Sequence, residues 1–143
     1  GEPLLQKDIW ELIDLLCLHR YEISIETNGT CMIPSSFLTR DNISWVIDYK
    51  LDFASQMRES NYFGCIKKDW IKFVVQSMLD LKEIFNIKNR LISLGCRANF
   101  AISPVFTKQS QKGGVQDLLD CLILRKEFDF VINLQLHKFV NLK

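Results

Sequence analysis

The residues best suited to bind a ligand stand directly after apolar stretches of this chain. Gly1, Glu2 and Pro3 form a turn before a helical pattern, and Thr27 and Asn28 end an alternating stretch. The other candidates at such places are Lys50, Ser103, Gln135, His137 and Lys138. Together they offer carboxylate, hydroxyl, amide, imidazole and ammonium groups, which can hold a small polar ligand by hydrogen bonds and charge. We therefore predict a binding rim built from several successive turns.

Strands and helices that alternate along the chain would position these residues. Apolar or alternating stretches that end at turn signals predict strands at 21–27, 43–49, 70–75, 99–103 and 130–136. Apolar residues at helical spacing predict helices at 6–20, 77–94 and 111–126. A short helix is expected after Pro34, and residues 51–68 are expected to be a long loop with a helical piece. Parallel βαβ units would bring the carboxyl ends of the strands, and hence the candidates, to one rim.

The predicted fold class is α/β with a parallel sheet of about five strands. Five strands in 143 residues are too few for a closed eight-stranded barrel, which takes about 250 residues. The sheet is therefore expected to be open or to form part of a (β/α) barrel. No internal repeat, low-complexity tract or linker divides the sequence, so residues 1–143 are predicted to form a single domain.

Composition argues against several kinds of partner. The net charge of +1 gives no electrostatic case for nucleic acid or a membrane surface, and no apolar run approaches the roughly 18 residues of a membrane span. The five cysteines are odd in number and scattered without a Cys-x-x-Cys pair, which favours reduced thiols and a cytoplasmic location. Cys17 and Cys121 lie in helical patterns and are predicted to be buried.

Other kinds of site find little support in the sequence. Gly113 and Gly114 make neither a phosphate loop nor a dinucleotide fingerprint, no Gly-x-Ser-x-Gly elbow occurs, and two histidines cannot build a histidine-rich metal site. Simpler roles also compete for the candidates: Asn28 before Gly29 is a turn signal, and a lysine such as Lys50 is often a solvated cation. A small basic cluster of Lys67, Lys68 and Lys72 is explained by strand alternation.

Six short motifs follow one another along the chain. Gly-Glu-Pro-Leu-Leu-Gln stands at 1–6, and Ile-Glu-Thr-Asn-Gly-Thr follows at 25–30. The later motifs are Asp-Tyr-Lys-Leu at 48–51, Trp-Ile-Lys-Phe-Val-Val at 70–75, Ile-Ser-Pro-Val-Phe at 102–106 and Leu-Gln-Leu-His-Lys at 134–138. Taken in order, these motifs resemble those of the 7-carboxy-7-deazaguanine synthases, a family of radical S-adenosylmethionine enzymes. The resemblance spans nearly the whole chain, and the ordered set is more specific than the first motif, which is shared across the superfamily.

The resemblance implies conversion of 6-carboxy-5,6,7,8-tetrahydropterin to 7-carboxy-7-deazaguanine with loss of ammonia. The cofactors implied are S-adenosylmethionine, a four-iron four-sulfur cluster and magnesium. By the same resemblance, Gly1, Glu2 and Pro3 would face the methionyl amine, and Thr27 and Asn28 would add polar groups. Lys50 would meet a cofactor or substrate carboxylate, and Ser103 would lie at the cofactor. Gln135, His137 and Lys138 would bind the pterin and its carboxylate.

Departures from the family pattern limit what this chain can do alone. None of its cysteines has the Cys-x3-Cys-x2-Cys spacing of the family's cluster motif, so the chain resembles the C-terminal part only and is expected to be inactive by itself. Residues 52–57 read Asp-Phe-Ala-Ser-Gln-Met where the family has Pro-Ser-Ser-Gly-Met. A sheet edge left uncovered in such a partial barrel is expected to be covered in a homodimer.

Two other functions stay open at this stage. One is a radical enzyme of the activase type, whose partner would be a protein with a glycyl-radical site. The other is a non-catalytic α/β domain that uses the same rim for a small anionic ligand. Binding of S-adenosylmethionine and of the pterin would separate these hypotheses.

Overall fold

The computed structural model describes residues 1–105 and 114–134, which contain one five-stranded parallel sheet. The strands are β1 (Ile23–Thr27), β2 (Ile43–Lys50), β3 (Trp70–Val75), β4 (Asn99–Pro104) and β5 (Phe130–Ile132). They lie side by side in chain order, and every pair is parallel. The α/β class and the parallel sheet are confirmed, and the sheet is not closed.

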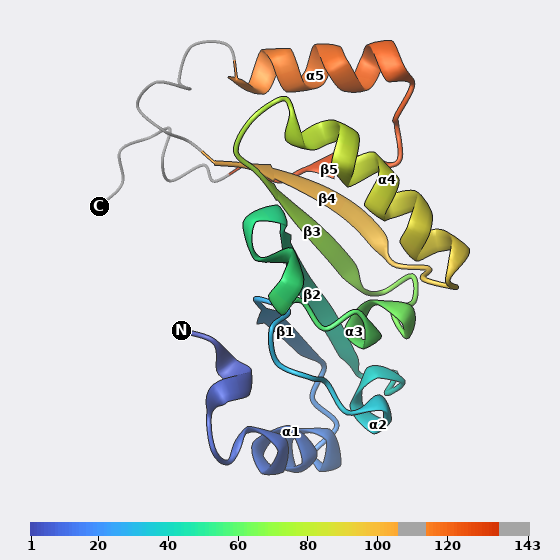
Figure 1. The fold of residues 1–143 in the computed structure, drawn as a ribbon. Helices are drawn as coiled ribbons and strands as arrows, with labels where there is room; N and C mark the ends of the chain where they lie inside the picture. The colour runs from blue at the N-terminus through green and yellow to red at the C-terminus, as the bar shows by residue number, and fades with distance from the viewer. Residues whose placement is uncertain (106–113, 135–143) are drawn as a thin grey trace.

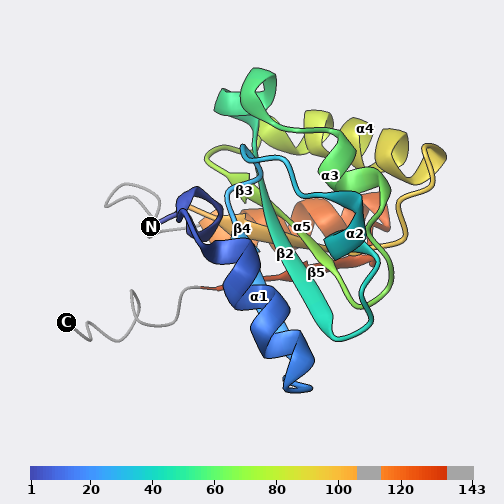
Figure 2. The same ribbon diagram turned by 90° about the horizontal axis from the view of Figure 1, so that it is seen from below.

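Helices gather on one face of this sheet (Figures 1 and 2). They are α1 (Ile9–Leu18), α2 (Ser35–Leu38), α3 (Ser60–Phe63), α4 (Asp80–Ser93) and α5 (Gly114–Arg125). The 3-10 helices η1 (Pro3–Leu5) and η2 (Leu51–Gln56) lie at the carboxyl ends of β1 and β2. Crossovers of one hand between neighbouring strands place successive helices on the same side. The opposite face of the sheet is left to the strands' other side chains and to the turn at residues 1–3.

Alternation along the strands separates the two faces. In β2, the side chains of Ile43, Trp45, Ile47 and Tyr49 are buried, whereas the residues between them are half-buried. In β3, Phe73 stands at the centre of the covered face and lies 5.6 Å from the ring of Tyr49 and 6.2 Å from those of Phe100 and Phe130. Offset and edge-on aromatic contacts at such spacings stabilise a core beyond simple burial. The covered face is therefore the hydrophobic core.

Most predicted elements are present, with shifted ends. The helix predicted at 6–20 is shorter, because a 3-10 turn at Pro3–Leu5 precedes α1. The strand predicted at 130–136 forms ladder pairs only at Phe130–Ile132 among the described residues, and positions 135 and 136 lie outside them. Cys17 and Cys121 were predicted to be buried, but both are half-buried and pack against the core; Cys65 and Cys96 are the buried thiols.

The segment at 51–68 carries two short helices and a buried polar anchor. Asn61 in α3 is fully buried, where its Oδ1 accepts from the amide of Ile33 at 2.8 Å and its Nδ2 donates to the carbonyl of Cys31 at 2.7 Å. These bonds tie α3 to the turn after β1, because buried amide groups must find partners. The segment thereby holds the carboxyl end of β1 in place.

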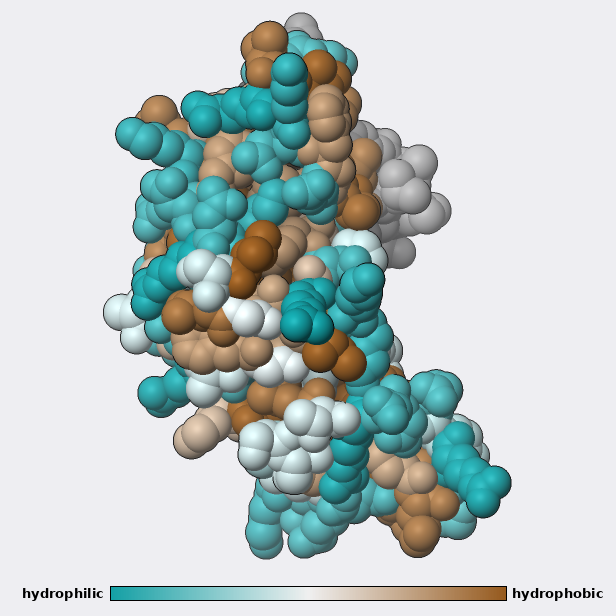
Figure 3. Space-filling model, turned by 90° about the vertical axis from the view of Figure 1, so that its right-hand side faces the viewer, coloured by the Kyte–Doolittle hydropathy of each residue, from teal (hydrophilic) through white to brown (hydrophobic). Residues whose placement is uncertain are grey.

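The outer surface is mixed in character. Figure 3 shows the side that carries the helices, where hydrophilic side chains surround scattered hydrophobic ones. In α1, Leu12, Leu15 and Leu18 are exposed, and in α5 so are Ile123 and Leu124. Within the described ranges, no helix is long and apolar enough to cross a membrane.

Candidate functional site

A polar pocket lies on the uncovered face, at the carboxyl ends of β1 and β2. Its volume is about 340 Å³. The turn at the start of the chain and three strands contribute its lining: Gly1, Glu2, Pro3, Glu26, Thr27, Asn28, Asp48 and Lys72. Carboxyl ends of parallel strands are the usual place for ligands in α/β folds. The first five residues of the rim predicted from the sequence, Gly1, Glu2, Pro3, Thr27 and Asn28, thus line one pocket.

Glu2 connects the two motifs that meet there. Its Oε1 accepts from the Thr27 hydroxyl at 2.6 Å, and its Oε2 accepts from the Asn28 amide at 2.7 Å. Oε1 also accepts from the amide of Leu4 at 3.2 Å, which caps the 3-10 turn η1. Hydrogen bonds to a charged acceptor are stronger than neutral ones. The carboxylate therefore fixes residues 1–4 against the end of β1.

The turn after β1 is shaped by Asn28 and Gly29. The Asn28 Oδ1 accepts from the amide of Thr30 at 2.9 Å and from its hydroxyl at 2.7 Å, which is a side-chain turn of the kind asparagine favours. Gly29 has φ +77°, a left-handed conformation that suits glycine. A Cβ there would stand 2.5 Å from the Tyr62 hydroxyl and 2.8 Å from the Asp48 carbonyl, so this turn packs tightly on α3 and β2.

Asp48 and two lysines form the charged part of the site. The Lys72 ammonium lies 2.9 Å from one carboxylate oxygen of Asp48, and the Lys50 ammonium lies 3.8 Å from the other. The side chains of Lys72 and Asp48 are 17% and 21% exposed, against 38% for Lys50. Charges that are partly withdrawn from water interact more strongly than surface pairs. The Asp48–Lys72 pair is therefore the firmer of the two.

The backbone of Asp48 is held as well as its side chain. The Tyr62 hydroxyl donates to the Asp48 carbonyl at 3.1 Å. Burial, with smaller effects from Tyr49 and Cys65, raises the pKa of Tyr62 well above its usual range, so this group stays a donor. The end of β2 is thus pinned from the core side while its carboxylate faces the pocket.

Strand register arranges the uncovered face in levels. Asp48 pairs with Lys72, and Lys72 pairs with Ala101. One level nearer the rim, Lys50 pairs with Val74 and Val74 with Ser103. The Asp48–Lys72 pair therefore lies one level below Lys50 and Ser103, in the floor of the uncovered face.

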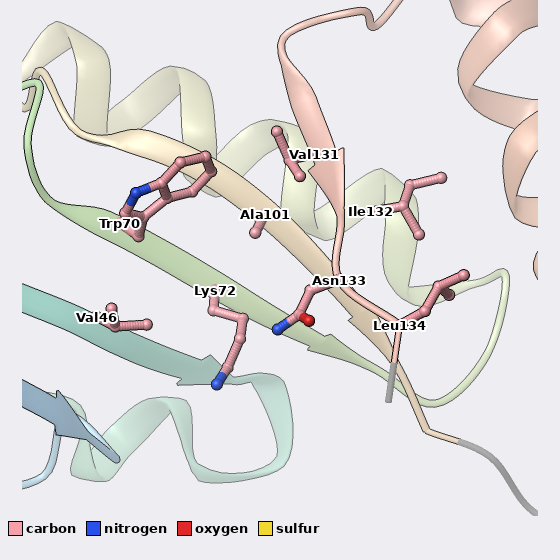
Figure 4. A pocket seen from close by; sticks show the side chains of 8 residues that line it. All are labelled: Val46, Trp70, Lys72, Ala101, Val131, Ile132, Asn133 and Leu134. Carbon is pink, nitrogen blue, oxygen red and sulfur yellow. The ribbon is translucent and has the colours of Figure 1, made fainter. Parts of the chain in front are cut away.

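An apolar hollow of about 480 Å³ adjoins the polar pocket on this face (Figure 4). Its lining comes from β2 to β5 and the residues after β5: Val46, Trp70, Lys72, Ala101, Val131, Ile132, Asn133 and Leu134. Figure 4 shows the indole of Trp70 at one end and Lys72 and Asn133 toward the other. Apolar walls with a few polar groups are typical of small-molecule sites.

The other predicted residues fall in different places. Lys50 lines a small separate pocket with Leu51 and Asp52 rather than the polar one. Ser103 is buried in β4, on the uncovered face by its register. Gln135, His137 and Lys138 lie outside the described residues. The structure thus brings together the candidates of the first two motifs and keeps Lys50 apart from their pocket.

Three residues of the pocket were given no binding role from the sequence: Glu26 and Asp48, which lie within the motifs at 25–30 and 48–51, and Lys72. Their signal was the alternation of charged with apolar residues in β1 to β3, which places charges on one face of the sheet. In β3, Trp70 and Lys72 alternate with the buried Ile71 and Phe73. The alternation of buried and less buried residues in β3 explains why Lys72 points away from the hydrophobic core. Its pairing with Asp48 depends on the register between β2 and β3.

The described part of the chain holds no group of three or more His, Cys, Asp or Glu side chains that could bind a metal ion. The carboxylates of the polar pocket suit a cationic group instead. Asp48 already has Lys72 beside it, and the carboxylate of Glu2 accepts from three protein donors. Glu26 lines the same pocket with an exposed side chain.

Comparison with known proteins gives one clear relative. The chain is 37% identical over 144 residues to a protein of Clostridium acetobutylicum named 7-carboxy-7-deazaguanine synthase. The match takes in 98% of this chain, which spans about 63% of the relative's length. No family model matches the chain, and no solved structure matches it. Over nearly its whole length the chain is therefore similar to 7-carboxy-7-deazaguanine synthase, which confirms the resemblance carried by its ordered motifs.

Proposed function

We propose that this chain forms the ligand-binding rim of an enzyme that converts 6-carboxy-5,6,7,8-tetrahydropterin to 7-carboxy-7-deazaguanine with loss of ammonia. The observation that carries the proposal is the meeting of the two N-terminal motifs in one pocket. Glu2 holds both Thr27 and Asn28, although 25 and 26 positions separate them along the chain. The named relative supports the same reaction class.

The polar pocket suits the amino-acid end of S-adenosylmethionine. Its lining offers the carboxylates of Glu26 and Asp48 to an ammonium group, and hydroxyl and amide groups at Thr27 and Asn28. When bound, S-adenosylmethionine and a four-iron four-sulfur cluster would supply the radical chemistry, and the protein would bind and orient the reactants. Gly1, Glu2 and Pro3 would form one wall of this pocket.

The apolar hollow suits the heterocyclic substrate. Its volume of about 480 Å³ lies within the range of roughly 300–1,000 Å³ found for small-molecule sites. Trp70 offers an aromatic surface, and Asn133 can donate to or accept from ring polar groups. Gln135, His137 and Lys138 follow directly in the sequence and stay our candidates for holding the pterin and its carboxylate.

The cluster and magnesium need ligands from elsewhere. The 143 residues contain no Cys-x3-Cys-x2-Cys motif, and the described part has no metal-binding group of three such side chains. We therefore propose that these residues bind S-adenosylmethionine weakly and do not turn over substrate alone. We also propose that the chain forms a homodimer, which sedimentation velocity would test.

Calorimetric titration of the chain with S-adenosylmethionine, the carboxypterin and inorganic phosphate tests the function. We expect the chain to bind S-adenosylmethionine and the carboxypterin. We expect Thr27→Val to bind S-adenosylmethionine more weakly, whereas the control Thr39→Val, at the exposed end of α2 and far from the pocket, should bind it as the wild-type chain does. Binding of phosphate alone would favour a non-catalytic anion-binding domain. Binding of S-adenosylmethionine without the pterin would favour an activase. Iron binding and reductive cleavage by this chain alone would contradict its inactivity.

A further inference from the structure

One lysine of α4 is buried with its charge paired. The side chain of Lys88 keeps 5% of its accessible surface, whereas Lys82 on the same helix is exposed. The Lys88 ammonium lies 2.9 Å from a carboxylate oxygen of Glu127 and 3.2 Å from one of Asp129. Lysine is rarely buried unless its charge is paired in this way. Both partners belong to the turn between α5 and β5, so Lys88 joins α4 to that turn.

The same ammonium lies against the first residue of β5. It stands 4.6 Å from the centroid of the Phe130 ring. Phe130 is buried, and its ring lies 5.8 Å from that of Phe85 and 6.2 Å from those of Phe73 and Phe100. A cation is attracted to an aromatic face, more strongly where both are withdrawn from water. Lys88 therefore holds the first residue of β5 as well as the turn before it.

Few other contacts restrain β5 in the described part of the chain. It is three residues long, stands last in the sheet and pairs with β4 over Phe130–Ile132. One more bond continues the ladder, in which the amide of Asn133 donates to the carbonyl of Ile102 at 2.8 Å. Among the described residues, only the ion pairs of Lys88 reach the segment after α5. A short strand with few hydrogen bonds opens readily, so its position depends on such contacts.

One wall of the apolar hollow is carried by this strand and the residues after it. Residues 131–134 are four of the eight that line the hollow (Figure 4). Successive side chains of a strand point to opposite faces of the sheet. Phe130 points into the core, where Lys88 meets it, and the next residue, Val131, faces the hollow. A contact on the covered face thus fixes the wall on the other face.

We propose that Lys88 is a positioning residue for the heterocyclic substrate, because it holds β5 where residues 131–134 complete the hollow. This rests on the proposed function, in which the hollow takes the pterin. A wall that is already in place loses less entropy when the ligand binds, which raises the affinity. The polar pocket has no lining residue after Lys72. Binding of S-adenosylmethionine there should therefore not depend on Lys88.

The test compares the two ligands by calorimetric titration of the wild-type chain and three variants. We expect Lys88→Met to bind the carboxypterin about 3- to 30-fold more weakly, the usual effect of a residue that acts through an intermediate element, and S-adenosylmethionine unchanged. The control Lys82→Met, on the exposed side of the same helix, should bind both as the wild-type chain does. Glu127→Gln keeps an acceptor but loses the charge, and should weaken the pterin by a smaller factor. Its side chain is 26% exposed, so this variant carries the test if Lys88→Met does not fold.

Hydrogen exchange measures the hold on the strand directly. In Lys88→Met the Asn133 amide should exchange about 10-fold faster than in the wild-type chain, while the amides of β3 keep their rates. Equal acceleration in β3, or equal weakening of both ligands, would mean that Lys88 supports the whole fold, and would overturn the inference. A wild-type chain that binds the pterin, with Lys88→Met binding it as well, overturns the inference alone. A wild-type chain that does not bind the pterin overturns the proposed function and the inference with it.

Discussion

The Thr27 hydroxyl donates to the Glu2 carboxylate at 2.6 Å, the shortest link between the start of the chain and the sheet. With the bond from the Asn28 amide to the second carboxylate oxygen, it makes Glu2 a cross-link between a 3-10 turn and the end of β1. The glutamate of the first motif therefore has a structural partner in the second. The Glu2 carboxylate thereby joins the two motifs.

Replacement of Glu2 by alanine should loosen this wall of the pocket. We expect the free energy of unfolding to fall by about 1–3 kcal/mol, because the Thr27 hydroxyl and the Asn28 amide lose a charged acceptor. Urea denaturation of Glu2→Ala, Thr27→Val and the double variant gives the coupling between the two side chains. Effects of the single changes that simply add would show that the bond contributes nothing.

Gly29 should tolerate no side chain. In Gly29→Ala, the left-handed φ of +77° costs about 1–2 kcal/mol, and contacts of 2.5 Å and 2.8 Å with Tyr62 and Asp48 add strain. Gly95 is a matched control, since its φ is +98° and no atom lies within 4 Å of its Cβ position. We expect a larger fall in melting temperature for Gly29→Ala than for Gly95→Ala. Equal falls would mean that the turn can move away from Tyr62.

Asp69 should be among the side chains most costly to remove. It is fully buried at the start of β3, where it accepts from the amide of Trp45 at 2.9 Å and from that of Ile66 at 2.8 Å. Asp69→Ala leaves two buried amides without acceptors, at about 1–3 kcal/mol each. Asp69→Asn keeps one carbonyl oxygen and should lose less. Denaturation by urea measures both variants, and a fall below about 1 kcal/mol in Asp69→Ala would show that water replaces the carboxylate.

Much of the fold follows from local pattern, because strand alternation and helical spacing are properties of short segments. The stretch 70–75 was predicted with its observed limits, and 99–103 ends within one residue of β4. The start of α1 was not predicted, since the Glu2 side chain caps a separate turn through contacts with residues 27 and 28. Such a boundary depends on a partner distant in the sequence.

The sequence predicted the site residues that belong to motifs. It did not predict those whose position depends on the register between strands. Gly1 to Pro3, Thr27 and Asn28 were identified by residue type and place, and they share one pocket. Lys72 was assigned to strand alternation, which gives the face of a side chain but not its neighbour. Lys72 lies beside Asp48 because of the register between β2 and β3. The sequence of neither strand alone specifies that register.

Stability should fall at alkaline pH through buried thiols and tyrosines, and Cys65 and Tyr62 are the two whose pKa is raised most. Burial is the main cause that raises the pKa of the Cys65 thiol and of Tyr62, so both stay protonated in the folded chain. In the unfolded chain they ionise near pH 8.5 and 10. The folded chain then binds more protons than the unfolded one, so stability is intact below about pH 8.5 and declines by up to about 1.4 kcal/mol per pH unit and group above those values. Urea denaturation between pH 7 and 11 measures the free energy of unfolding of the wild-type chain, Cys65→Ala and the control Cys31→Ala, whose thiol is half-buried. We expect the decline with pH to be smaller in Cys65→Ala than in the wild-type chain, and unchanged in Cys31→Ala. If the free energy of unfolding fell with pH equally in all three chains, the titrating group would not be Cys65.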